Sequence, residues 1–186
     1  QFMPLNTIYQ LAAEPKERLL SANKLILIGD AFNEFLCGVG VAEVSLASTT
    51  QLYNPITKTW SKKLINALEF PEQLFPEIIP SGARLGMMKK HLANDAGIKQ
   101  IEVVASCSHD TGAAVAAVPA SGKNWAYLSA GTWCLMGVES KVPVINKKCM
   151  EFNFTNEIGY GGSIRLLKNI IGLWLVQECR REWARQ

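Results

Sequence analysis

IEVVASCSHDTGAAVAAV, residues 101–118, is the stretch that decides the fold class. Its first residues, Ile101–Ala105, form a largely apolar run rich in β-branched side chains, which predicts a buried strand. The polar segment Ser106–Asp110 follows at once, and the small apolar residues Gly112–Val118 predict a closely packed helix. A strand that leads directly into a helix is typical of α/β or α+β proteins.

Upstream of this stretch the sequence mainly predicts helices. Apolar residues at helical spacing indicate two helices within residues 2–36, and Ser61 is expected to cap a short helix over Lys62–Glu69. Pro71–Gly86 contains several prolines and glycines and is expected to be a loop, whereas Met87–Ala96 is expected to be a short helix.

Downstream, Trp125–Ser129 and Thr132–Val138 predict two strands joined by a tight hairpin at Ala130-Gly131. One helix is expected from Ser163 to the end of the chain, because apolar residues recur there at helical spacing. The change in sequence character near residue 97 predicts two domains, with a ligand cleft between them.

Composition excludes several classes of protein. Hydrophobic residues make up 48% and charged residues 19% of the 186 residues, so the chain can form a sizeable core. The net charge is +3 with scattered Lys and Arg, which gives no reason to expect a nucleic-acid partner. The apolar runs are too short to span a bilayer, and no signal pattern opens the sequence, so a cytoplasmic protein without a membrane partner is expected. The oligomeric state is not indicated.

The five cysteines have no CxxC spacing and are odd in number. We expect free, mostly buried thiols in a reducing compartment rather than a disulfide framework, and we assign no metal site. The first residue is not Met, which suggests that the chain is cut from something longer.

The first candidate site is Ser108-His109-Asp110-Thr111, which lies between the predicted strand and helix. An Asp at the end of a strand can act as a general base toward a substrate hydroxyl, and the neighbouring helix N-terminus would keep it ionised. Two alternatives remain open from spacing alone. Asp110 could simply cap the helix, or Cys107 and His109 could form a catalytic pair.

Two further segments could bind a ligand through their backbone. Leu128–Trp133 contains a hairpin glycine and two hydroxyls that could hold phosphate oxygens, although it is not a Walker loop and a plain turn explains it equally well. Gly159–Ser163 is expected to open the last helix and could cradle an anion there, with a flexible linker as the alternative. Asn169 and Gln177 would share one face of that helix, as a polar stripe or as ordinary surface.

Together these segments resemble the rhamnulokinase branch of the FGGY carbohydrate kinases. The resemblance runs through nearly the whole chain, and many motifs occur in the same order. The matching segments are Met3–Leu11, Ala47–Leu52, Ser108–Thr111, Tyr127–Gly137, Asn156-Glu157, Leu167–Ile170 and Gly172–Leu175.

The resemblance implies a partial actin-like (ribonuclease H-like) α/β ATPase fold. Residues 1–97 would form the end of the N-terminal, sugar-binding lobe, and residues 98–186 the start of the C-terminal, nucleotide-binding lobe. The resemblance implies that Asp110 is the catalytic base and that it contacts the sugar. His109, Thr111 and Asn169 would also contact the sugar. Gly131, Thr132 and Gln177 would contact ATP.

The implied reaction transfers the γ-phosphoryl group of ATP, bound with Mg²⁺, to the primary hydroxyl of L-rhamnulose, which gives L-rhamnulose 1-phosphate. The alternatives are a kinase for another ketose, such as L-fuculose or xylulose, and a non-catalytic sugar-binding module on the same fold. Ala130 and Cys134 stand where the family usually has Ser, which would weaken nucleotide contacts slightly, and Gly29 stands where Pro is expected. The Asp-x-Gly phosphate loop and the adenine-binding segment of the family lie outside the sequence, so the segment alone is expected to be inactive.

Overall fold

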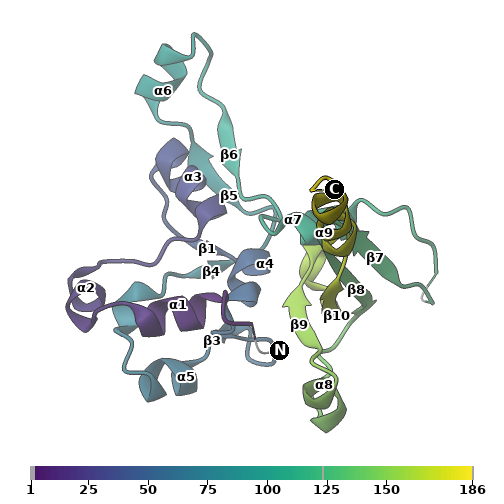
Figure 1. Cartoon of the computed structure of the whole chain (residues 1–186). Coiled ribbons are helices and arrows are strands. Elements are labelled where there is room, and N and C mark those ends of the chain that lie inside the picture. The colour runs from purple at the N-terminus through teal and green to yellow at the C-terminus, as the bar shows by residue number, and fades with distance from the viewer. Residues whose placement is uncertain (1–2, 123, 186) are drawn as a thin grey trace.

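A computed structural model describes residues 3–122 and 124–185 and shows an α/β chain in two parts (Figure 1). The first part, residues 3–105, combines short helices with two-stranded sheets. Its elements are α1 (Thr7–Ala13), α2 (Lys16–Ser21), α3 (Ile28–Cys37), β1 (Ala42–Glu43), α4 (Val44–Ala47), η1 (Ser48–Thr50), β2 (Tyr53–Asn54), β3 (Thr59–Trp60), α5 (Lys62–Ala67), η2 (Glu72–Leu74), β4 (Ile78–Ile79), β5 (Arg84–Met87), α6 (Lys90–Asp95) and β6 (Glu102–Val104).

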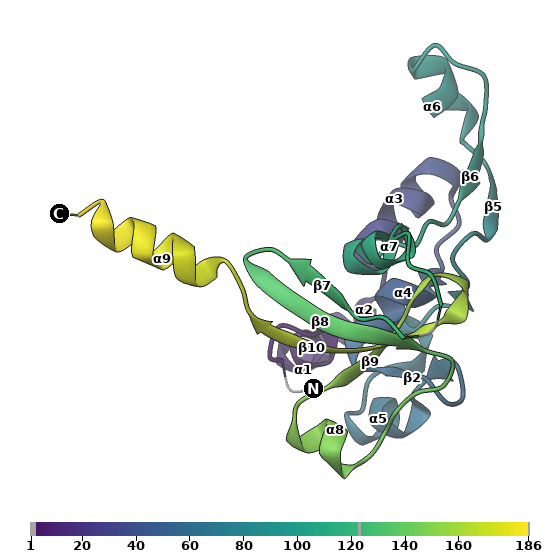
Figure 2. The same ribbon diagram turned by 90° about the vertical axis from the view of Figure 1, so that its right-hand side faces the viewer.

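The second part, from residue 106 onward, is built on one four-stranded antiparallel sheet in the order β7-β8-β10-β9. Its elements are α7 (Asp110–Ala116), β7 (Tyr127–Ala130), β8 (Trp133–Ser140), α8 (Lys147–Glu151), β9 (Thr155–Ile158), η3 (Tyr160–Gly162), β10 (Ile164–Ile171) and α9 (Trp174–Trp183). α7 packs on the sheet through Val115, which joins Tyr127 and Leu167 in a buried apolar cluster. Figure 2 shows α9 projecting away from the end of this sheet.

Apolar burial also stabilises the first part. Leu11, Leu52, Ile65 and Phe70 form its main cluster, so that α1 and α5 pack against the same core. Trp60 packs at the edge of that cluster, and its indole N–H donates to the carbonyl of residue 76 at 2.7 Å. An indole that is both packed and hydrogen-bonded stabilises one orientation of the β2–β3 hairpin.

The predicted helix from Ser163 to the end is wrong over its first half. Ile164–Ile171 is the central strand β10, paired with β8 along its whole length, from Ile164↔Ser140 to Ile171↔Trp133. β10 mixes apolar residues with Arg165, Lys168 and Asn169, and the periodicity of so short a segment cannot separate a strand from a helix. Gly159–Ser163 is therefore the turn between β9 and β10, not the start of a helix.

The upstream predictions need smaller corrections. Residues 3–37 form three helices rather than two, and residue 2 lies outside the described residues. The region expected to be a loop before residue 86 contains β4 and the start of β5, and the helix expected from Met87 begins only at Lys90. The short strands there gain their order from pairing with distant partners, which no local pattern reports.

The strand predicted over Ile101–Ala105 is present, but it is only half buried. Val103 and Ala105 point inward, whereas Ile101 and Val104 are exposed. β6 pairs antiparallel with β5 alone among the described strands, so its other edge has no strand beside it. The hairpin strands β7 and β8 and the helix after Asp110 confirm the prediction for the centre of the chain.

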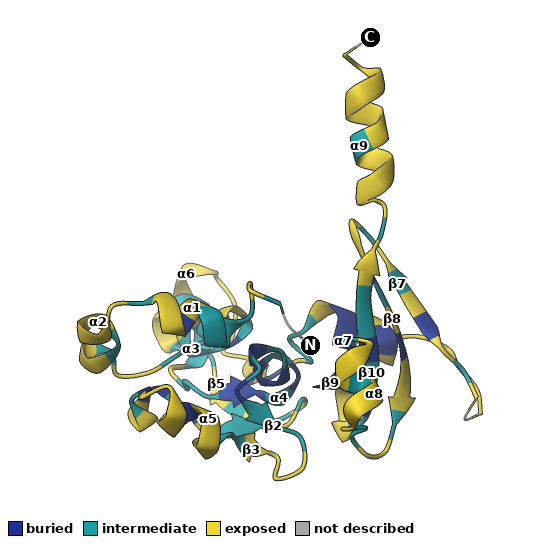
Figure 3. Ribbon diagram, turned by 60° about the horizontal axis from the view of Figure 1, so that its bottom comes forward, coloured by how far each residue is buried: buried dark blue, intermediate teal, exposed yellow. Residues whose placement is uncertain are grey.

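The two parts of the chain meet at α4, which Figure 3 shows as a buried turn between the first part and β9. Ser48, next to α4, accepts a hydrogen bond from the backbone N–H of Ile158 at 2.8 Å. In the described residues, no helix has both the length and the apolarity needed to cross a membrane.

Candidate active site

The segment that carries Asp110 is held in place by the first part of the chain. After β6 the backbone turns toward α4, where the N–H of Ser108 donates to Glu43 Oε2 at 3.1 Å. The N–H of His109 donates to Ser45 Oγ, also at 3.1 Å. α7 then begins at Asp110. The position of the Asp110 segment therefore depends on side chains some 65 residues away in the sequence.

Glu43 is the centre of this support. It is fully buried, it caps α4 by accepting from the N–H groups of Ser45 and Leu46, and it accepts from the hydroxyl of Ser81 at 2.5 Å. Its own N–H is bound by both oxygens of Asp30, each at 3.1 Å. Burial raises the pKa of Asp30 to about 6, and the hydrogen bond from Glu43 opposes that rise.

A cavity of about 390 Å³ opens beside the start of α7 and contains all four residues predicted to contact the sugar. His109, Asp110 and Thr111 reach it from α7 and its N-cap, and Asn169 reaches it from β10. The amide of Asn169 donates to the sulfur of Met3 at 3.3 Å. The remaining lining residues are Met3, Leu5, Asn6, Thr7, Thr49, Trp133, Leu135 and Glu157.

Asp110 is the first residue of α7 and His109 is its N-cap, so the alternative that Asp110 caps the helix is wrong. Its Oδ1 accepts from the N–H of Thr111 at 2.6 Å, so the carboxylate does bind the first turn of α7. Yet 96% of the side chain is exposed and it lines the cavity. The hydrogen bond from Thr111 orients the carboxylate without burying it, and an oriented, accessible carboxylate can accept a proton from a ligand.

His109 is the opposite case, because only 19% of its side chain is exposed. Its Nδ1 lies 2.8 Å from Nη2 of Arg165, and Nε2 lies 3.8 Å from Asp110 Oδ1. Burial first, and the Arg165 cation second, lower the pKa of His109 to about 4, so the ring is neutral at neutral pH. Because Nδ1 is engaged by Arg165, His109 is not arranged to serve as a base for Cys107.

Two of the residues predicted to contact ATP, Gly131 and Thr132, form the turn between β7 and β8, and the third, Gln177, is on α9. The carbonyl of Gly131 accepts from the N–H of Leu173 at 2.9 Å, and the carbonyl of Thr132 accepts from that of Trp174 at 3.2 Å. The amide of Gln177 donates to Thr132 Oγ1 at 3.4 Å. The prediction that Asn169 and Gln177 share a helix is wrong, because Asn169 is on β10 and Gln177 on α9.

Trp133 connects the two sets of predicted residues. It lines the cavity of Asp110, and it also lines a second, apolar cavity of about 390 Å³ together with Thr132, Ile171 and Trp174. The cavity of Asp110 and the second cavity therefore adjoin at Trp133, and of the residues predicted to contact ATP only Thr132 lines the second one.

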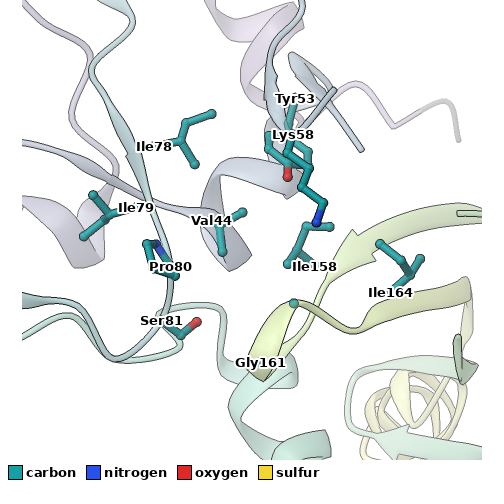
Figure 4. Close-up of a pocket in the computed structure, with 11 residues that line it drawn as sticks. Val44, Tyr53, Lys58, Ile78, Ile79, Pro80, Ser81, Ile158, Gly161 and Ile164 are labelled. Carbon is teal, nitrogen blue, oxygen red and sulfur yellow. The ribbon is translucent and has the colours of Figure 1, made fainter. Parts of the chain in front are cut away.

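The glycines of the third candidate segment line a different cavity, of about 280 Å³, between the two parts of the chain (Figure 4). Figure 4 shows Val44, Ile78 and Pro80 of the first part facing Ile158 and Ile164 across it. Its lining is mainly apolar, with Lys58 and Ser81 among its polar members. Gly161 and Gly162 have positive φ angles of 67° and 78° and serve the tight turn before β10.

Four side chains that support this site were not predicted from the sequence: Asp30, Glu43, Arg165 and, as a functional group, Glu157. All four are buried. Arg165 could have been noticed in the sequence because it is a charged residue flanked by two apolar ones, Ile164 and Leu166. A buried charge needs a partner, so that position pointed to a polar contact across the sheet.

The cysteines are free, as predicted, but they are not mostly buried. Cys134 is buried and Cys179 is exposed, whereas the other three are partly exposed.

Comparison with known proteins identifies the class to which this arrangement belongs. Residues 1–118 match the family model of the N-terminal domain of the FGGY family of carbohydrate kinases, and residues 126–186 match that of its C-terminal domain. The chain belongs to the FGGY family of carbohydrate kinases.

Within that family the chain is similar to curated rhamnulokinases. It is 42% identical to the rhamnulokinase of Enterococcus faecalis over 181 residues, which cover 97% of this chain and 37% of that protein. It is 41% identical to that of Bacillus subtilis over 182 residues, which cover 98% and 38%. The chain thus spans well under half the length of these relatives.

Solved structures agree on the fold. The gluconate kinase from Lactobacillus acidophilus superposes with a TM-score of 0.77 at 22% identity, over 98% of this chain and 36% of that one. The xylulose kinase from Rhodospirillum rubrum gives a TM-score of 0.76 at 14% identity, over 91% and 35%. The prediction of a partial sugar-kinase fold is confirmed.

Proposed function

We propose that the full-length protein transfers the γ-phosphoryl group of ATP to L-rhamnulose and releases L-rhamnulose 1-phosphate. The observation that carries this proposal is the cavity in which His109, Asp110, Thr111 and Asn169 come together from separate elements. The similarity to rhamnulokinases over nearly the whole chain supports the choice of sugar.

Asp110 is the general base in this proposal. Its carboxylate is accessible from the cavity and fixed by Thr111, so it can take the proton of a sugar hydroxyl as that oxygen attacks phosphorus. Neutral His109 and the amide of Asn169 orient the sugar through hydrogen bonds. Phosphoryl transfer depends mainly on such positioning and on charge neutralisation.

ATP would lie along the hairpin at Gly131 and Thr132, with Gln177 beside it. The hydroxyl of Thr132 and the amide of Gln177 already face each other at 3.4 Å, and both side chains are exposed, so they can turn to phosphate oxygens. Mg²⁺ would enter with ATP and neutralise charge on its phosphates. Residues 3–122 and 124–185 contain no group of three or more acidic, His or Cys side chains that could hold a metal, and we assign none of them to it.

We place this reaction in the cytoplasm. The five free cysteines support a reducing compartment.

The test is ADP release by the full-length protein with Mg-ATP and a panel of ketoses that includes L-rhamnulose, L-fuculose and xylulose. Turnover with L-rhamnulose as the preferred sugar supports the proposal. Preference for another ketose would retain the mechanism and replace the substrate. If no ketose is turned over but sugars still bind, the protein is a binding module on a kinase fold.

A further inference from the structure

We infer that Arg165 is a positioning residue for the sugar: by donating to Nδ1 of His109, it holds the imidazole in the tautomer whose Nε2–H serves the sugar cavity. This inference rests on the proposed function. Arg165 does not line the cavity itself and acts only through His109.

The hydrogen-bond chemistry of the pair determines where the proton of His109 resides. A guanidinium can only donate, and its Nη2 lies 2.8 Å from Nδ1, so Nδ1 must present a lone pair. A neutral imidazole carries one proton, which must then be on Nε2. Nε2 is therefore a hydrogen-bond donor, suited to a sugar oxygen rather than to a sugar hydroxyl proton.

Glu157 makes this arrangement depend on Arg165. Its Oε2 lies 3.1 Å from Nη2 of Arg165 and 3.4 Å from Nδ1 of His109. Carboxylate and unprotonated Nδ1 are both acceptors, so the guanidinium is what bridges them. Without Arg165, the nearest group to Nδ1 is a carboxylate, which would attract a proton onto Nδ1.

The strand register explains how Arg165 reaches this position. It lies on β10 directly opposite Glu157 of β9 and Glu139 of β8. Glu139 is bound by the hydroxyl of Ser163 at 2.6 Å, whereas Glu157 pairs with Arg165. The guanidinium is thus directed across the sheet toward His109.

Stability alone does not account for this residue. The Arg165 side chain is 0% exposed, and within the described part of the chain its Nε and Nη1 atoms have no hydrogen-bond partner. A buried ion pair is often no more stabilising than apolar side chains of similar volume. The contact to His109 gives the guanidinium a role that an apolar side chain could not perform.

The charges around His109 are balanced in favour of the neutral ring. Asp110 of α7 and Glu43 before α4 favour the protonated ring, whereas burial and Arg165 disfavour it and prevail. Glu157 of β9 is also close to the ring, and burial raises its pKa against the opposing effect of Arg165. Loss of Arg165 therefore removes one of the two influences, burial and the nearby cation, that lower the pKa of His109.

The test compares Arg165→Met with Arg165→Lys in the full-length protein labelled with ¹⁵N at histidine, with the His109 signals assigned by their loss in His109→Gln. We expect the wild type and Arg165→Lys to show an unprotonated Nδ1 and a protonated Nε2. In Arg165→Met we expect a proton on Nδ1. Arg165→Met leaves Glu157 as an unpaired buried charge and can destabilise the fold. The double variant Glu157→Met/Arg165→Met removes that charge and is measured alongside. In the double variant we expect His109 to lose its fixed preference for a proton on Nε2.

Kinetics separate positioning from a general structural role. We expect Arg165→Met to raise KM for L-rhamnulose about tenfold with a smaller change in kcat, the loss expected for one hydrogen bond. Added to His109→Gln, Arg165→Met should cost little more, because both variants remove the same interaction. An unchanged Nε2–H tautomer in Arg165→Met, or full additivity with His109→Gln, would overturn the inference. Absence of turnover with every ketose in the wild type would instead overturn the proposed function, while the ring-nitrogen spectra would still decide the role of Arg165.

Discussion

The proposed sugar side, around Asp110, and the proposed nucleotide side, around Thr132, are built in contrasting ways. On the sugar side, Asp110 and His109 are positioned by buried side chains such as Glu43 and Arg165, which come from distant parts of the chain. On the nucleotide side, Thr132 and Gln177 are exposed and are positioned by backbone hydrogen bonds between a hairpin and α9. The positions of the side chains proposed to contact the sugar therefore depend on how both parts of the chain pack together. The positions of those proposed to contact the nucleotide depend only on the hairpin and α9. Variants can therefore damage one side and spare the other.

The largest effect is expected from Asp110→Asn. Loss of the base should lower kcat by roughly 10²–10⁴-fold and leave sugar affinity within a few-fold, because the amide has the same shape and remains accessible. Steady-state ADP release and equilibrium sugar binding measure the two quantities. Near-normal turnover in this variant would refute the assignment of Asp110 as base.

Glu43→Ala is expected to rank next and to affect stability as well as the sugar side. It removes the hydrogen bonds to Ser45, Leu46, Ser81 and Ser108 and leaves buried donors unpaired, so we expect a loss of roughly 2–4 kcal/mol in the free energy of unfolding. Urea denaturation measures this loss.

Glu102→Gln is the control for Glu43→Ala. Its carboxylate is exposed and lies 3.6 Å from Arg84, so its loss should change stability by less than about 1 kcal/mol. Equal losses in the two variants would show that Glu43 does not have the supporting role assigned to it.

Gly172→Ala should affect the nucleotide side alone. A Cβ at this position would lie 2.5 Å from the carbonyl oxygen of Gly131 and 2.6 Å from the sulfur of Cys134, so α9 must shift away from the hairpin. We expect KM for ATP to rise about fivefold to tenfold, with KM for sugar unchanged.

Gly40→Ala provides the matched control. Its Cβ would meet only the flexible ends of Lys24 and Glu34, which can move aside. A rise in the sugar KM of Gly172→Ala equal to that of its ATP KM would mean that the two sides are not independent.

The smallest effect concerns acid stability. The folded-state pKa of His109, about 4, lies below its ordinary value of 6.5, so the unfolded chain binds more protons between these pH values. The contribution of neutral His109 to the free energy of unfolding is fully present above pH 6.5 and is lost as the pH falls toward 4. His109→Gln should therefore lose less stability than the wild type over this range in thermal unfolding.

Two carboxyl groups change stability with pH in the opposite direction, and both are present in the wild type and in His109→Gln. Burial raises the pKa of Asp30 and Glu157, so each favours folding more as pH falls. His91→Gln, a change at an exposed position of α6, should retain the wild-type pH dependence. Identical profiles for His109→Gln and the wild type would contradict the burial assigned to His109.

Much of the local structure around the proposed sugar site could be predicted from the sequence because its signal is local. The run from Ile101 to Val118 places a strand, a polar turn and a helix in order, and the structure confirms that order. The hairpin at Ala130-Gly131 was equally clear. The domain boundary near residue 97 and the roles of the site residues stay predictions.

The errors occurred where tertiary pairing decided the structure. Ile164–Ile171 has the apolar content of a buried helix but became a central strand, because β8 and β9 were available on both sides. The support from Glu43 and the Arg165–Glu157 pair joins residues that no spacing rule connects. Such contacts become visible only when the chain is folded.

The central claim is that Asp110 activates the primary hydroxyl of a ketose. It is tested most directly by ³¹P NMR of the product that the full-length protein forms from Mg-ATP and L-rhamnulose, with Asp110→Asn in parallel. We predict ADP and a phosphate monoester on the C1 hydroxyl in the wild type, and almost none in the variant. A phosphate at another position of the sugar, equal product from both proteins, or release of inorganic phosphate without a sugar phosphate would contradict the account.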